Sequence, residues 1–277
     1  MKKIIALALT ALLALSLFAC VAEEEDGSSI DDYASPNYTH RLTAEQGGGT
    51  LTFTDGHAES AVISDYTGPS KLHTVVIPEK ISEADREVSA IGPRAFYQTP
   101  TIKEVILPDT VTSIGEMAFA GCTALEKIVI PASVTTIDDY AVYGCTSLKS
   151  IVFEGKEIKT LGDFAFLECS ALAEIELPEG LESIGKQAFG KCKSITKLTT
   201  PSTLKTIGEL AFYGCEGLNA DGALTLSASI EHIGEGAFGS PAVVNDYHFQ
   251  MNKHFIKAPE GSYAAKYVAN LPEVTEE

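Results

Sequence analysis

The chain has 277 residues, and 45% of them are hydrophobic. It carries 38 acidic and 20 basic residues, which give a formal net charge of −18 at pH 7. A surface this acidic repels a phosphate backbone, so we expect no nucleic-acid partner.

Residues 1–19 have the pattern of a secretory signal peptide. Lys2 and Lys3 precede an apolar run over residues 4–18, which is short for a membrane-spanning helix. The sequence Leu-Phe-Ala-Cys at 17–20 resembles a bacterial lipobox, in which the cysteine is diacylated and becomes the mature N-terminus. The alternative is an ordinary signal peptide followed by a chance cysteine. The lipobox implies an exported protein that contacts the membrane only through several acyl chains on Cys20.

Residues 20–46 are expected to form an acidic tether. The run Glu23 to Asp26, followed by Gly-Ser-Ser, is too poor in apolar residues to pack. One interpretation is that this run is a solvated linker. The other is that it is a surface-export signal, because an acidic cluster close after Cys20 resembles that of some Gram-negative lipoproteins. In the second case the anchored protein is exposed on the cell surface.

Residues 47–78 are predicted to form an N-terminal cap. Two strand-like segments, 50–53 and 61–63, flank Asp55 and Gly56, which suit a hairpin turn. The terminal units of a repeat stack must cover its open end.

Residues 79–240 repeat one motif about every 23 or 24 residues. An Ile-Gly or Leu-Gly pair is followed by an Ala-Phe pair and then by a cysteine. In one repeat Asp138 replaces the glycine and Val142 replaces the phenylalanine. A period of about 20–29 residues is typical of a leucine-rich-repeat solenoid, whose units must stack to bury their apolar faces. The Ile or Leu of the pair stands at Ile91, Ile114, Ile137, Leu161, Ile184, Ile207 and Ile233.

One repeat shows the expected local structure. Ile128 and Ile130 alternate with Lys127 and Val129, as in a short strand with one buried face. Pro131 then ends the strand. We predict an α/β solenoid of the leucine-rich-repeat type, with about six or seven coils of short parallel strands joined by helical or 3₁₀ turns.

These residues resemble the BspA-type leucine-rich repeat family of bacterial surface lipoproteins, whose unit reads approximately C-x-x-L-x-x-I-x-I-P-x-x-V-x-x-I-G-x-x-A-F. The units at 122–142 and 192–212 follow this pattern closely, and the resemblance covers about residues 74–238. It implies a solenoid that takes part in adhesion to host proteins or cell surfaces. The ligand is set by outward residues, which vary without harming the fold.

Five cysteines occupy the same repeat position. Neighbouring coils place them about 5 Å apart, a distance that does not exclude a disulfide. Five thiols cannot all pair within one chain, however, and neither a C-x-x-C pair nor a nearby histidine cluster supports a zinc site. We expect no metal site, and we expect a column of buried thiols that pack as hydrophobic groups. The column consists of Cys122, Cys145, Cys169, Cys192 and Cys215.

The sequence lacks common catalytic signatures. It has no G-x-S-x-G and no H-E-x-x-H motif. Residues 180–186 resemble the start of a phosphate-binding loop, but Gln187 stands where Ser or Thr should bind Mg²⁺. We therefore expect no enzymatic activity and no cofactor. An enzyme would need a polar cluster in the caps, near His248 and His254.

Residues 241–277 are predicted to form a C-terminal cap and tail. Ser262 stands where it could cap a helix that carries Tyr263 and Tyr267 four residues apart. These aromatic residues, with Tyr247, Phe249 and Phe255, either pack on the last coil or form a binding platform.

The outward strand positions are the candidate binding face for a protein or glycan ligand, with host extracellular matrix as one source. Three apolar residues, Ile106, Val129 and Val152, are contiguous there, and exposed apolar patches often mark interaction sites. The alternative is that β-branched residues simply favour strands. If this face binds a ligand, the function is adhesion or host interaction. The alternative function is that of a structural spacer in the cell envelope. One stripe contains Glu104, Lys127, Ser150, Glu174 and Lys197, and the other contains Ile106, Val129, Val152, Glu176 and Thr199.

Overall fold

The computed structural model describes residues 38–271 except Ala44, residues 57–59, Glu83, Asp221 and residues 240–252. The described residues fall within one compact unit, Pro36–Glu277. Several predictions concern segments outside the described residues, namely the signal peptide, Cys20, the acidic cluster, Tyr247, His248 and Phe249.

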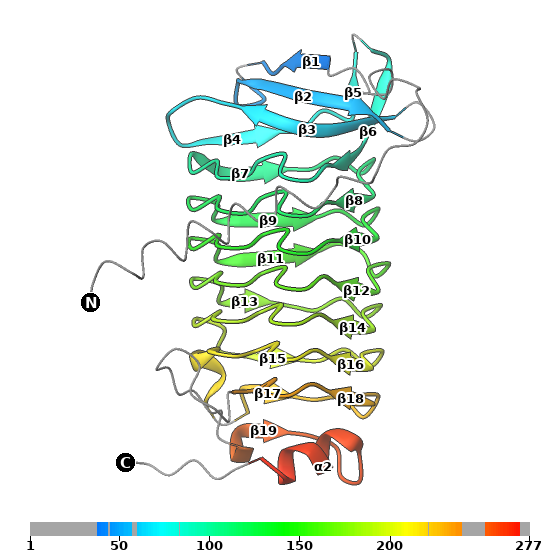
Figure 1. Ribbon diagram of the computed structural model, residues 1–277, viewed down its shortest axis with the longest axis vertical. Coiled ribbons are helices and arrows are strands. Elements are labelled where there is room, and N and C mark those ends of the chain that lie inside the picture. The colour runs from blue at the N-terminus through cyan, green and yellow to red at the C-terminus, as the bar shows by residue number, and fades with distance from the viewer. Residues whose placement is uncertain are drawn as a thin grey trace, which may run out of the picture. The chain divides into compact units, whose positions relative to one another are not determined.

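The coils of this unit stack one on the next and form parallel ladders of short strands (Figure 1). The predicted solenoid is confirmed. The strand that the repeat pattern predicts forms a five-stranded sheet, here called the first sheet. Its members are β4 (His73–Val76), β7 (Ile102–Ile106), β9 (Lys127–Ile130), β11 (Ser150–Phe153) and β13 (Glu174–Ile175). Later coils continue in a three-stranded sheet of β15 (Leu198–Thr199), β17 (Leu224–Thr225) and β19 (Ile256–Lys257).

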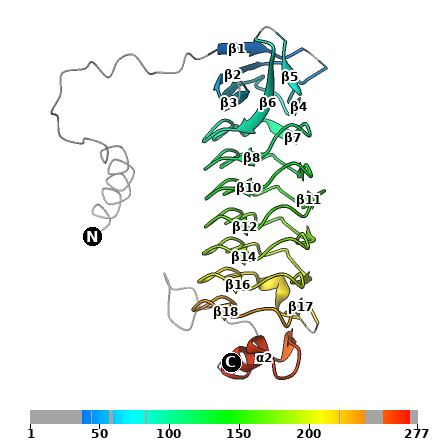
Figure 2. The same ribbon diagram turned by 90° about the vertical axis from the view of Figure 1, so that its right-hand side faces the viewer.

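Each coil contributes a second strand, which the repeat pattern did not predict. This strand ends at the Ile or Leu of the Ile-Gly pair, and the register keeps equivalent residues opposite one another, for example Ile137 opposite Ile114 and Leu161. The resulting ladder, here called the second sheet, runs along the other side of the coils (Figure 2). It consists of β6 (Arg86–Ile91), β8 (Ser113–Ile114), β10 (Thr136–Ile137), β12 (Thr160–Leu161), β14 (Ser183–Ile184), β16 (Thr206–Ile207) and β18 (His232–Ile233).

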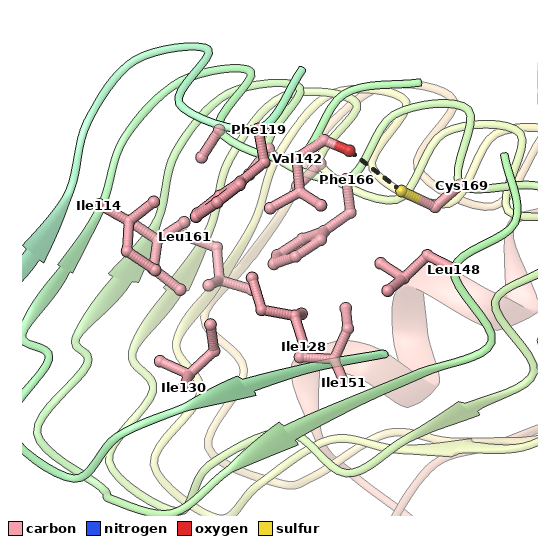
Figure 3. Packing of buried hydrophobic residues seen from close by; sticks show 14 of the residues in the cluster. Ile114, Phe119, Ile128, Ile130, Val142, Leu148, Ile151, Leu161, Phe166 and Cys169 are labelled. Carbon is pink, nitrogen blue, oxygen red and sulfur yellow. Dashed lines mark hydrogen bonds between the residues drawn. The ribbon is translucent and has the colours of Figure 1, made fainter. Parts of the chain in front are cut away.

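The core lies between the two sheets. Side chains from both sheets and from the outer turns meet there (Figure 3). The phenylalanines of the Ala-Phe pairs stack from coil to coil, and the ring centroids of Phe166 and Phe189 lie 5.3 Å apart. The stack continues to Phe212 at 5.5 Å and to Phe238 at 5.7 Å. Val142 interrupts it, but this side chain is equally buried.

The outer segments keep part of the predicted 3₁₀ pattern, since alternate N–H groups bond three residues back, for example Ala118 N to Gly115 O at 3.1 Å, but they do not form regular helices. In most coils alternate N–H groups donate to the next coil: Met117 N to Asp139 O at 3.1 Å, and Phe119 N to Ala141 O at 2.7 Å. A positive φ of 55° at Met117 turns the peptide groups away from the local helical pattern. Helical structure among the described residues is limited to η4 (Glu216–Leu218), η5 (Lys253–Phe255) and α2 (Tyr263–Ala269).

Antiparallel strands extend the second sheet beyond β6 at its N-terminal end. Strands β2 (Thr50–Asp55) and β3 (Ala61–Thr67) pair as the predicted hairpin, and β1 (Tyr38–Arg41) pairs with β2. Strand β3 also pairs in parallel with β6, while β5 (Lys80–Ile81) pairs with it in antiparallel fashion. The hairpin therefore satisfies the backbone groups of the first coil.

Helix α2 packs against the last coil. The Ser262 Oγ accepts a hydrogen bond from Ala265 N at 3.0 Å, which confirms the predicted cap. Ala264 is buried, and the ring of Tyr267 meets Phe238 edge-on, with centroids 6.1 Å apart. The burial of Ala264 and the contact of Tyr267 with Phe238 indicate that the helix packs on the last coil. Tyr263 does not share in this packing, because its side chain is exposed.

The five repeat cysteines form a column of free, fully buried thiols, as predicted. The sequence did not predict that each thiol donates a hydrogen bond to a carbonyl of the preceding coil, such as Cys169 Sγ to Val142 O at 3.2 Å. Burial raises the pKa of the Cys122, Cys169 and Cys215 thiols to about 12. Cys145 and Cys192 shift in the same direction for the same reason.

The buried column predicts slow thiol chemistry. At about pH 8.5, a thiol with a pKa of about 12 is thiolate in only about one molecule in three thousand. Iodoacetamide should therefore leave the repeat thiols unmodified in the native protein and alkylate all five in unreduced guanidinium chloride. Peptide mass mapping measures both. Rapid labelling of the native protein, or fewer than five alkylated thiols after unfolding, would contradict the free, buried column.

Candidate functional site

The outward side of the first sheet brings together most of the first predicted stripe. Lys127 lies opposite Glu104 on one side and Ser150 on the other, and Ser150 lies opposite Glu174. Lys127 is exposed, while Glu104 and Ser150 are partly exposed. The column therefore offers both signs of charge and a hydroxyl at successive coils.

The second stripe forms an apolar column beside it. Val129 lies opposite Val152, and the side chains of Ile106 and Val152 are 46% and 41% exposed. Val76 lies opposite Ile106 and extends the column to β4. Val76 is absent from the predicted stripe because it lies within residues 47–78, which are predicted to form the cap. The segment Val75-Val76-Ile77-Pro78 matches the spacing of Ile128 to Pro131 and could have revealed it.

The remaining predicted residues lie outside the first sheet. Lys197 and Thr199 are exposed, but β15 pairs with β17, and no pairing in the described part of the chain joins β15 to β13. Glu176 is exposed and follows the end of β13. The structure thus joins the predicted residues from β7 to β13 and leaves these three beyond the edge of the sheet.

An ion-pair ladder runs along the residues that precede the first stripe. Lys149 Nζ lies 3.0 Å and Lys103 Nζ 3.4 Å from the two carboxylate oxygens of Glu126. The hydrogen bond from Lys149, together with the hydrogen bond and charge of Lys103, lowers the pKa of the Glu126 carboxyl. Exposed pairs of this kind add little stability. They lie next to the first stripe, which separates them from the apolar column, so this face offers a ligand a charged stripe beside branched aliphatic side chains.

The face offers contacts rather than an assembled reaction centre. Among the residues that the structure describes, no group of three or more His, Cys, Asp or Glu side chains could hold a metal ion. In the same residues, no helix is long and apolar enough to cross a membrane. The chemistry available on this face is apolar burial, hydrogen bonding and charge.

Adjacent residues on β11 test the inward and outward assignment. Val152→Lys should change the free energy of unfolding by less than about 0.5 kcal/mol, because the side chain is 41% exposed. Ile151→Lys should cost about 3–5 kcal/mol or prevent folding, because Ile151 is only 3% exposed and an unpaired charge would be buried. Urea unfolding measures both, and equal losses would contradict the assignment.

Comparisons with known proteins agree with this architecture. Residues 89–219 match the BspA-type leucine-rich repeat region in six copies. A leucine-rich repeat protein of T. pallidum is similar in structure over 85% of this chain and 98% of its own, with a TM-score of 0.65 and 23% identity. A leucine-rich repeat protein of Bacteroides ovatus has a TM-score of 0.51 and 25% identity over 71% of this chain and 58% of its own. No curated protein sequence matches the chain.

Proposed function

Because residues 89–219 match the BspA-type leucine-rich repeat region, we propose that the chain is a surface lipoprotein that binds a protein ligand through the first sheet. Proteins with these repeats are generally found on the bacterial surface or secreted, and the repeats are typically binding scaffolds rather than enzymes. Adhesion or host interaction is the function that this face supports best.

The apolar column of Val76, Ile106, Val129 and Val152, of which Ile106 and Val152 are exposed and the other two partly exposed, carries this proposal. The repeat itself does not require an apolar residue at this spacing, because Glu176 and Thr199 occupy it in later coils beyond the edge of the first sheet. Branched aliphatic side chains that remain partly in water gain free energy when a partner covers them. Such a patch favours a protein ligand over a glycan, since apolar burial is a main source of affinity between proteins.

The β-branched residues of the column also have an explanation that requires no ligand. Val and Ile favour strands, so the same side chains could serve the sheet alone. The protein would then act as a spacer in the cell envelope. The two functions differ in whether changes on this face affect binding while the fold is kept.

A capture experiment separates them. The mature protein is immobilised and exposed to host extracellular matrix and, separately, to an extract of the organism's own envelope. The double variant Val129→Lys and Val152→Lys should weaken capture of the recovered partner at least about tenfold, because two charges would be buried at the interface. The double variant Thr136→Lys and Thr160→Lys is the matched control, since it adds the same two charges to exposed positions in the second sheet.

Two outcomes would count against the binding proposal. If the double variant keeps full affinity, the first sheet is not the binding site. If neither extract yields a saturable partner, the spacer function is favoured.

The lipid anchor has its own test. Cys20→Ala should abolish incorporation of labelled fatty acid and release the protein from the membrane fraction, because the thiol is the proposed attachment point of the acyl chains. Fractionation and acyl labelling measure both effects. Unchanged membrane partitioning would reject the lipoprotein proposal without affecting the proposed binding face.

A further inference from the structure

One coil departs from the repeat where the others carry glycine. In the next coil, a Cβ on Gly162 would lie 2.5 Å from the carbonyl carbon of Asp138, so glycine lets consecutive coils approach closely. Asp138 nevertheless occupies this position in its own coil, and Val142 replaces the stacked phenylalanine of the same coil. Departures from a structural rule often mark positions kept for another purpose.

Two aromatic rings stack just outside the core next to this departure. Tyr140 and Phe164 occupy equivalent positions in consecutive coils, with φ of 56° and 59°. Their ring centroids lie 4.6 Å apart and the planes differ by 13°. Tyr143 meets Tyr140 edge-on, with centroids 6.1 Å apart. All three side chains are partly exposed, whereas Phe166 of the core stack is fully buried.

Carboxylates surround this ring pair. Asp139 Oδ1 accepts a hydrogen bond from Asp163 N at 2.7 Å, and Asp163 Oδ1 accepts one from Lys186 N at 2.7 Å. Burial raises the pKa of the Tyr140 hydroxyl, the charges of Asp139, Asp163 and Glu116 raise it further, and the charge of Lys186 acts in the opposite direction. The acidic groups of three coils therefore act on one tyrosine, and backbone hydrogen bonds hold two of them in place.

The negative charge at this point is not balanced by a close ion pair. Partial burial raises the pKa of the Asp138 carboxyl, and the neighbouring charges of Asp139 and Glu116 add to the rise. The Lys186 ammonium pairs with Glu209 at 3.0 Å. Within the described part of the chain, no lysine or arginine lies within 4.0 Å of the Glu116, Asp138 or Asp139 carboxylates.

We propose that Tyr140, Phe164 and the surrounding carboxylates bind a basic segment of a partner protein, with an arginine side chain stacked on the outer face of one ring of the pair. A guanidinium group is planar, stacks on aromatic rings and donates to carboxylates, so it meets both features of the surface. The site lies on the outer turns and does not depend on the proposed role of the first sheet. Charge complementarity with the carboxylates favours this occupant over an acidic or neutral one.

A short peptide of alternating arginine and glycine is the probe, and its citrulline analogue, which lacks the charge, is the ligand control. Calorimetric titration of the folded protein at physiological salt should show binding of the arginine peptide and at least about tenfold weaker binding of the citrulline peptide. Tyr140→Leu should weaken arginine-peptide binding about three- to tenfold. Leucine is compatible with this position, because Leu210 occupies it in a later coil with φ of 55°.

Two further variants keep the test independent of any folding defect in Tyr140→Leu. Asp138→Gly restores the repeat pattern and should weaken binding about threefold, as should the isosteric Glu116→Gln. Glu157→Gln removes an exposed charge elsewhere and should leave affinity unchanged. Equal effects of all three charge variants would indicate general attraction to a chain of net charge −18 and would overturn the proposal. Undiminished binding to Tyr140→Leu, or binding only of a neutral glycan, would overturn it as well.

Discussion

The close approach of consecutive coils is the constraint on which this structure depends. A coil is too small to enclose its own apolar side chains, so each buries them against the coils on either side. The repeated glycine permits this approach: a Cβ on Gly185 would lie 2.7 Å from the carbonyl carbon of Gly162. The Phe stack, the thiol column and both ladders of strands then follow, because equivalent side chains must meet at every step.

The same constraint separates structural positions from those available for recognition. An inward residue such as Ile128 has a neighbour in each adjoining coil and is fully buried. An outward residue touches only its neighbours along the face, so Val152 and Thr199 can differ without a change in the core. Both proposed binding surfaces consist of outward or partly exposed side chains. The regular stack supports them, and their identity departs from what stacking alone requires.

Sequence reasoning found the parts of the fold that leave a local pattern. The alternation around Ile128 and Ile130 revealed one strand per coil, and Ser262 revealed the start of α2. The second strand was missed because Ser113–Ile114 has only two residues, too few to show an alternation. The turn itself was predicted, but its hydrogen bonds to the next coil were not, because Met117 adopts a positive φ without being glycine. The Tyr140 site was missed because it is assembled from three coils.

The dependence of each coil on its neighbours can be measured by hydrogen exchange on the full chain with Phe189→Ala. Removing this buried ring should cost about 3–5 kcal/mol. The account predicts faster exchange at Phe166 N and Phe212 N, which donate to Ala188 O and Ala237 O, in the coils on both sides. The effect should fade towards the N-terminal hairpin. Faster exchange confined to the coil that carries residue 189 would contradict the account, because the stability of the adjoining coils would then not depend on that coil.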